Sequence, residues 1–161
     1  MTIKAGDQLP DVTVTIMGKN GPEPIKTSDY FRGRKIALFS VPGAFTPTCH
    51  AKHLPGFLEH YDALKSKGVD AVAVTAVNDV FTLDAWLKER GAAGKIDGLA
   101  DGSAVFVRAL GLELDLTDFG LGVRGKRFSA VVEDGVVKWI NVEENSSLAT
   151  VSSAEATLER L

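Results

Sequence analysis

Two apolar stretches of strand length constrain the fold of this chain more than any other feature. The first, residues 35–41 (KIALFSV), and the second, residues 69–77 (VDAVAVTAV), are typical of strands buried on both faces of a sheet. Between them, apolar residues from 48 to 67 recur at helical spacing until Gly68, and Pro55 predicts a kink or break in that helix. Two buried strands joined by a helix form a β-α-β unit, so the sequence predicts an α/β protein.

The remaining segments predict a mixed sheet. Residues 12–16 alternate and Asn20-Gly21 marks a turn, which indicates a hairpin near the N-terminus. The strongest hairpin signal is Glu133-Asp134-Gly135, between two apolar stretches. Further elements are predicted as a helix over 82–90, a strand over 96–100, a helix over 103–110, hairpin strands over 128–132 and 136–140, and a helix to Leu161 with a capping box at Ser152 and Glu155. We therefore predict one domain over residues 1–161, with a thioredoxin-like α/β fold, a mixed central sheet and an added N-terminal β-hairpin.

Composition excludes several classes of function. The 161 residues carry a net charge of −3 without a basic stripe, which argues against a nucleic-acid partner. No stretch approaches the ~20 apolar residues of a membrane span, and one cysteine with three histidines shows no zinc spacing, so we expect no membrane and no metal. The N-terminus lacks the apolar core of a signal peptide. We expect a cytoplasmic, reducing location, and a processed organelle form stays open as an alternative.

The single cysteine, Cys49, ends the run Pro42-Gly43-Ala44-Phe45-Thr46-Pro47-Thr48-Cys49 between the first buried strand and the helical pattern. Amides and the dipole at the start of a helix favour a thiolate there. A lone cysteine is more often an inert, buried apolar residue. Two prolines and a glycine in eight residues, however, fix an unusual backbone path that packing alone does not require. We therefore interpret Cys49 as a reactive thiol.

The motif around Cys49 resembles a known family. Pro42, Thr46 and Cys49 match the Pro-x-x-x-Thr-x-x-Cys signature of peroxiredoxins, and PGAFTPTC followed by HLPGF is similar to the branch with plant type II and mammalian type V enzymes. Further matching stretches are residues 77–79, 99–103, 111–116, 120–122 and 127–129. The resemblance covers nearly the whole chain. It implies a thioredoxin fold and a thiol-dependent peroxidase for hydrogen peroxide and alkyl hydroperoxides, with a role in peroxide detoxification and cell redox homeostasis.

The resemblance also implies the site. Cys49 would be the peroxidatic cysteine, assisted by Thr46, Pro42 and Arg127. The residues that we expect to bind the peroxide or support its site are Gly43, Phe45, Thr48 and His53. Without the resemblance, we would interpret Arg127 as part of a solvent-exposed basic cluster over residues 124–127.

Peroxide reduction explains why these residue types are needed. A thiolate attacks one oxygen of the O–O bond and hydroxide or alkoxide leaves, yet a free cysteine has a pKa of about 8.5. Arg127 offers a permanent cation that favours the thiolate and binds peroxide oxygens. The Thr46 hydroxyl both donates and accepts hydrogen bonds. A lower thiol pKa produces more thiolate at neutral pH, but it also makes that thiolate a weaker nucleophile. A lowered pKa alone therefore does not explain a fast reaction, and we attribute most of the acceleration to hydrogen-bond donors aligned at the leaving oxygen.

The recycling step departs from many relatives, which carry a second, resolving cysteine. At the position where some plant members have it, this chain has Val74. The Cys49 sulfenic acid must therefore meet an external thiol. The resemblance favours glutathione or glutaredoxin, with thioredoxin as an alternative, and implies a homodimer without a bound cofactor.

Two other functions stay open on the sequence alone. One is a redox sensor, in which oxidised Cys49 is the signal. The other is a cysteine-dependent hydrolase or acyltransferase, in which His50 or His53 would act as the base.

Overall fold

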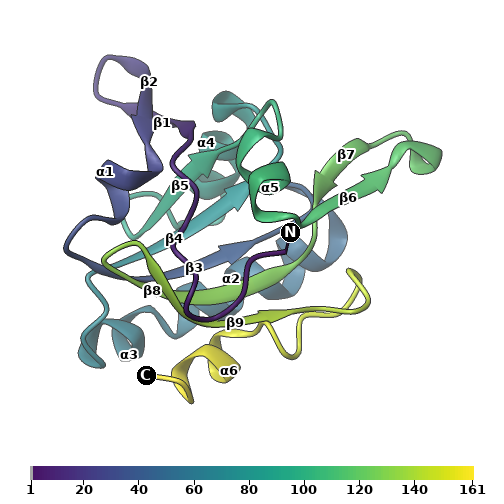
Figure 1. The fold of residues 1–161 in the computed structure, drawn as a ribbon. Coiled ribbons are helices and arrows are strands. Elements are labelled where there is room, and N and C mark those ends of the chain that lie inside the picture. Colours follow the sequence, from purple (N-terminus) through teal and green to yellow (C-terminus); the bar gives the residue numbers. More distant parts are fainter. Residues whose placement is uncertain (1) are drawn as a thin grey trace.

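The computed structural model describes residues 2–161 and shows a seven-stranded mixed sheet in the order β2-β1-β5-β4-β3-β8-β9 (Figure 1). Its strands are β1 (Thr13–Gly18), β2 (Gly21–Lys26), β3 (Lys35–Ser40), β4 (Ala71–Ala76), β5 (Ile96–Ala100), β8 (Phe128–Glu133) and β9 (Val136–Val142). Strands β3, β4 and β5 are parallel, whereas β8 pairs with β3 in the antiparallel direction. The N-terminal hairpin β1–β2 joins the sheet beside β5. This is the predicted thioredoxin-like plan with its added hairpin.

Helices cover both faces of the sheet. They are α1 (Thr27–Phe31), the π-helical segment η1 (Cys49–His53), α2 (Leu54–Glu59), α3 (Tyr61–Ser66), α4 (Val80–Glu89), α5 (Val105–Leu110) and α6 (Ala154–Leu158). The face that carries Phe39 packs against η1, α2, α3, α4 and α6, and the face that carries Leu38 packs against α1 and α5. Since neighbouring residues of β3 are buried on opposite faces, its four central residues, 36–39, are all apolar.

Residues 48–67 form the predicted helical segment, which is divided at two places. The π-helical turn η1 gives way to α2 directly before Pro55, where the sequence predicted a kink or break. A second break at His60 (φ −94°, ψ 11°), which the sequence did not predict, separates α2 from α3. The Leu54 amide bonds to the Cys49 carbonyl, five residues back, and Pro55 follows without an N–H to donate. Pro55 therefore lies in the first turn of α2, where a missing N–H is tolerated, directly after the widened turn.

The predicted cap at Ser152 is also wrong. Ser153 caps α6 by accepting a hydrogen bond from the Ala156 amide (3.1 Å), and the helix ends at Leu158. The Ser152 hydroxyl donates to Glu143 instead (2.7 Å). A buried carboxylate thus competes for the serine that the sequence pattern favours as the cap.

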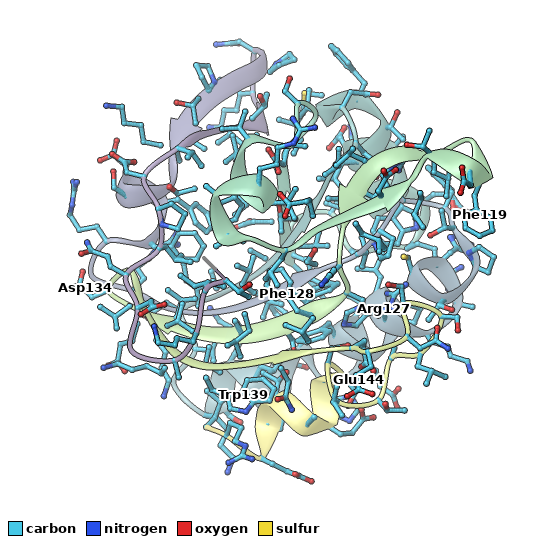
Figure 2. The ribbon with its side chains drawn as sticks, turned by 45° about the vertical axis from the view of Figure 1, so that its right-hand side comes forward. Phe119, Arg127, Phe128, Asp134, Trp139 and Glu144 are labelled. Carbon is cyan, nitrogen blue, oxygen red and sulfur yellow. The ribbon has the colours of Figure 1, made fainter. Side chains whose placement is uncertain are left out.

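Two elements have no counterpart in the sequence prediction. One is the short helix α1, and the other is an arm formed by β6 (Glu113–Leu116), a 3₁₀ turn (Thr117–Phe119) and β7 (Gly122–Gly125). The arm projects from the body of the molecule (Figure 1), and Figure 2 shows Phe119 at its tip. In the part of the chain described, no helix combines the length and apolar character that a membrane crossing requires.

Candidate active site

Cys49 lies at the carboxyl end of β3, where the loop over residues 41–48 leads into η1. The loop is held back against the sheet, since the Val41 amide bonds to the Thr75 carbonyl (3.2 Å) and the Ala44 amide to the Asn78 side chain (2.8 Å). The Cys49 side chain is fully buried (0% exposed) in the core of the helix-covered face that carries Phe39. The thiol is therefore shielded from bulk water.

Two polar groups contact the buried sulfur. Arg127 Nη2 lies 2.9 Å from Cys49 Sγ, and Thr46 Oγ1 lies 3.0 Å from it. The sheet explains how Arg127 arrives there: Ser40 at the end of β3 pairs with Phe128 on β8, so the preceding residue lies beside the loop that carries Cys49. Arg127 is buried (1% exposed) and lies near the start of β8 (Figure 2). At this distance the guanidinium stabilises a thiolate.

The Thr46 hydroxyl serves both protonation states of the thiol. Its single proton has two acceptors, the Gly43 carbonyl at 2.6 Å and the Cys49 sulfur at 3.0 Å. With a protonated thiol, the hydroxyl donates to Gly43 and accepts from S–H; with a thiolate, it donates to sulfur.

The Arg127 guanidinium is fixed by two further contacts. Its Nε donates to the Ser146 carbonyl (3.0 Å), and its Nη1 lies 2.8 Å from His53 Nδ1. His53 Nε2 is 2.8 Å from the Ser152 carbonyl, which only accepts, so Nε2 carries the proton and Nδ1 accepts from Arg127. Burial, together with the charge of Arg127, lowers the pKa of His53 to about 3. The histidine is therefore neutral over the physiological range.

A buried glutamate holds the loop that presents these carbonyls. Glu143 accepts hydrogen bonds from the amides of Thr150 and Ser152 (both 2.8 Å) and from the Ser152 hydroxyl (2.7 Å). Its own amide donates to the Arg127 carbonyl (2.9 Å). Glu143 thus joins the loop after β9 to the residue that contacts the sulfur. The sequence gives no signal for this role, since Glu143 belongs to no motif.

Pro42 and Gly43 form the buried wall of the loop. The Pro42 carbonyl accepts a hydrogen bond from Arg124 Nη1 (3.2 Å). A Cβ atom at Gly43 would lie 2.8 Å from the same nitrogen, so the close approach of Arg124 requires glycine. Arg124 was not predicted as a site residue, although it stands in the same basic cluster as Arg127.

The side chains of the other two residues expected at the site, Thr48 and Phe45, contact groups other than the sulfur. The Thr48 hydroxyl donates to the Ser147 carbonyl (2.8 Å) and ties the loop to the segment after β9. Phe45 has a positive φ of 65°, which is unusual for a side chain of this size, and packs over His50 and Trp86 with 48% of its surface exposed.

The histidine contacts argue against a hydrolase. Both ring nitrogens of His53 are engaged, by Arg127 and by the Ser152 carbonyl. His50 accepts a hydrogen bond from Trp86, away from the sulfur's contacts. Neither ring is placed to take a proton from Cys49.

Known proteins are similar to this chain over nearly its whole length, including the residues around Cys49. The family model described as Redoxin matches residues 4–158. The chain is 48% identical to Peroxiredoxin-2E-2, chloroplastic, of Oryza sativa subsp. japonica, over 99% of this chain and 73% of the relative. It is 44% identical to Peroxiredoxin-2B of Arabidopsis thaliana, over 99% of this chain and 98% of the relative. A solved structure of reduced Prx3 in complex with H2O2 from Vibrio vulnificus has a TM-score of 0.94 at 44% identity and covers 98% of each chain.

Proposed function

The chain belongs to the peroxiredoxins of the redoxin family, which are thiol peroxidases, and we propose that Cys49 is its peroxidatic residue, with Arg127 and Thr46 as its catalytic partners. One observation carries this assignment: a guanidinium nitrogen at 2.9 Å and a hydroxyl at 3.0 Å converge on one buried sulfur. The carbonyl groups of Gly43 and Pro42 support the site by accepting hydrogen bonds from Thr46 and Arg124.

The contacts account for each part of the reaction. The Cys49 thiolate attacks one peroxide oxygen, the O–O bond breaks, and hydroxide or alkoxide leaves and takes up a proton. Sulfur is oxidised to the sulfenic acid while the peroxide is reduced. Arg127 and Thr46 donate hydrogen bonds to the oxygens as charge moves from sulfur to the leaving oxygen. Because both donors are already in place and desolvated, little reorganisation is needed during the reaction.

We propose hydrogen peroxide and alkyl hydroperoxides as substrates. The related Prx3 of Vibrio vulnificus is described with bound H2O2, which supports the smaller substrate. The test is peroxide consumption by the reduced protein, followed as loss of peroxide and gain of mass at Cys49. A Cys49→Ser variant that consumes peroxide as fast as the wild type would remove the proposal.

We propose that an external thiol, glutathione alone or through glutaredoxin, reduces the sulfenic acid. Cys49 is the single cysteine, and position 74, in the buried strand β4, is valine. One thiol condenses with Cys49–SOH to give a mixed disulfide and water; a second thiol attacks the mixed disulfide and releases Cys49–SH and an oxidised dimer of the reductant. Turnover with glutathione and glutaredoxin, compared with thioredoxin and its reductase, tests this choice. Mass spectrometry identifies the adduct on Cys49.

We further propose a homodimer in a reducing, cytoplasm-like compartment. A reactive free thiol is maintained in such a compartment. Two phenylalanines support the dimer because they are unusually exposed: Phe81 (65%) and Phe119 (78%).

A further inference from the structure

A second group of polar side chains lies beside Cys49 and takes no part in the contacts to its sulfur. It consists of His50, Trp86 and Arg90, with the ring of Phe45 stacked over His50 (5.9 Å between centroids, 26° between planes). His50 follows Cys49 directly in η1, whereas Trp86 and Arg90 lie on the last turn of α4 and at its C-cap. We call this group the His50–Arg90 cluster.

The hydrogen bonds of the cluster fix which ring nitrogen carries the proton. Trp86 Nε1 donates to His50 Nδ1 at 3.1 Å, and an indole N–H only donates. Nδ1 must therefore be unprotonated, and the proton of His50 is on Nε2. The free side of the ring thus presents an N–H donor toward Arg90.

The cluster consequently has donors without an acceptor. Arg90 Nη1 lies 3.5 Å from His50 Nε2, and both atoms are donors, so they do not satisfy each other. Arg90 Nε is buried and has no hydrogen-bond partner among the described residues. The ion pairs within residues 2–161 do not include Arg90. A buried donor such as Arg90 Nε is normally paired, and an anion beside the cluster would supply an acceptor for the guanidinium and the His50 N–H.

An oxyanion fits the cluster better than a neutral group. A carboxylate accepts two parallel hydrogen bonds from a guanidinium, and its remaining lone pairs suit the Nε2–H of His50. The half-exposed Phe45 ring adds an apolar surface next to this position. The cluster is thus suited to a small organic anion that carries a carboxylate and contacts protein through its remaining atoms.

We propose that the His50–Arg90 cluster binds a carboxylate of glutathione and thereby directs its thiol to the oxidised Cys49. This rests on the proposed reductant, because glutathione is the ligand that combines a carboxylate with a thiol required at the adjacent residue. Arg90 and His50 would act as binding residues for the second half of the reaction, separate from the Arg127–Thr46 pair that serves the first half.

Direct binding is tested with S-methylglutathione, which carries the carboxylates but has no reactive thiol. The chain has two tryptophans, Trp86 in the cluster and Trp139 on the edge strand β9. In an NMR titration the indole N–H signal of Trp86 reports binding at the cluster, and the indole N–H signal of Trp139 serves as the internal control. We expect a saturable shift of the Trp86 signal that is lost in Arg90→Gln, with a static Trp139 signal. A Trp86 signal that stays still, or that moves equally in Arg90→Gln, would overturn the site.

The role in turnover is tested with a pair of thiols. Cys49 is oxidised with one equivalent of peroxide, and its reduction is timed with glutathione and with uncharged 2-mercaptoethanol. We expect the ratio of the two rates to fall about tenfold in Arg90→Gln, the size of a charge-assisted hydrogen bond at a partly exposed site. Arg160→Gln, at the exposed end of the chain, is the matched control.

The outcomes separate the two proposals. If the wild type is reduced by glutathione and Arg90→Gln keeps the same rate ratio, the carboxylate site is wrong and the reductant stands. If neither glutathione alone nor glutathione with glutaredoxin reduces the wild type, while thioredoxin does, both the reductant and this assignment are overturned.

Discussion

At Arg127 a single guanidinium divides its donors among three groups: the Cys49 sulfur, the His53 ring and the Ser146 carbonyl. A flat, forked cation meets all three at once, which a lysine ammonium on a flexible stem does not. The cost of burying the charge is offset only because each of these contacts is made. Arginine is therefore required at this position by geometry as well as by charge.

The Thr46 hydroxyl predicts a clear difference between two substitutions. Thr46→Val keeps the shape and removes the donor to sulfur and peroxide, so we expect the second-order rate of Cys49 oxidation to fall about a hundredfold, as for loss of one aligned donor. Thr46→Ser keeps the hydroxyl and should retain most of the rate. Stopped-flow oxidation by hydrogen peroxide measures both. Equal rates in the valine and serine variants would show that the hydroxyl is not used.

His53 predicts a pH dependence of stability. Its pKa is near 6.5 in the unfolded chain and about 3 in the fold, lowered by burial and then by the charge of Arg127. The unfolded chain therefore binds the proton first as pH falls. This contribution to stability is complete above pH 6.5 and is lost between pH 6.5 and about 3, with a slope of up to about 1.4 kcal/mol per pH unit.

Chemical unfolding between pH 7 and 4 checks this contribution. The free energy of unfolding should depend less on pH in His53→Gln than in the wild type. The same slope in both proteins would contradict the assignment.

The sequence motif predicted that Thr46 lies beside Cys49, but not the contacts that the neighbouring residues make. The motif fixes local spacing, and the hydroxyl of Thr46 reaches a sulfur three residues away. Thr48 is just as close in sequence, yet its hydroxyl turns to Ser147, a residue of a distant loop. The hydrogen-bond partner of the Thr48 hydroxyl depends on tertiary contacts, which the local sequence pattern does not specify.

At the scale of elements, the loop between β9 and α6 is tied together by one carboxylate. Glu143 accepts from the amides of Thr150 and Ser152, and the same loop supplies the carbonyls that hold Arg127 and His53. Glu143→Ala leaves these amides without partners, so we expect a loss of about 2–3 kcal/mol in the free energy of unfolding. We also expect slower oxidation of Cys49, because Arg127 loses its support.

Urea unfolding and peroxide kinetics of Glu143→Ala measure the two effects. Glu144→Ala, at the neighbouring exposed position, is the matched control (Figure 2). A Glu143→Ala protein with wild-type stability and rate would remove the proposed support.

The two serines before α6 give a separate prediction. Ser153→Ala removes the N-cap and should cost about 1 kcal/mol of unfolding free energy without changing the peroxide rate. The sequence suggested Ser152, because a serine three residues before Glu155 satisfies the capping-box spacing. Thermal unfolding of Ser153→Ala decides the matter, and an unchanged midpoint would mean that the cap contributes little.

At the scale of the whole molecule, the sheet brings the two halves of the site together. Cys49 follows β3, and Arg127 precedes β8; the antiparallel pairing of these strands makes the residues neighbours across 78 positions. The apolar runs predicted the strands, but an apolar strand has no preference for one buried neighbour over another. The expectation that Arg127 lies beside Cys49 therefore came from the family resemblance and not from hydrophobic periodicity, and the pairing of β3 with β8 was not predicted.

The exposed aromatic residues lead to a prediction about assembly. Phe119, at the tip of the β6–β7 arm, is 78% exposed, and a homodimer would cover such a side chain (Figure 2). In Phe119→Asp, dimer formation would remove water from the new carboxylate, which is costly. We therefore expect this variant to shift toward monomer in sedimentation equilibrium. A wild type that sediments as a monomer at every concentration would contradict the dimer.

The contact between Arg127 and the Cys49 sulfur is the interaction on which the proposed peroxidase reaction depends, and the rate of Cys49 oxidation by hydrogen peroxide measures its contribution. In Arg127→Gln the cation is lost while a polar side chain remains, and we predict a rate at least about a hundredfold lower than in the wild type. A folded Arg127→Gln protein that reacts with peroxide at the wild-type rate would show that the guanidinium does not activate the Cys49 thiol.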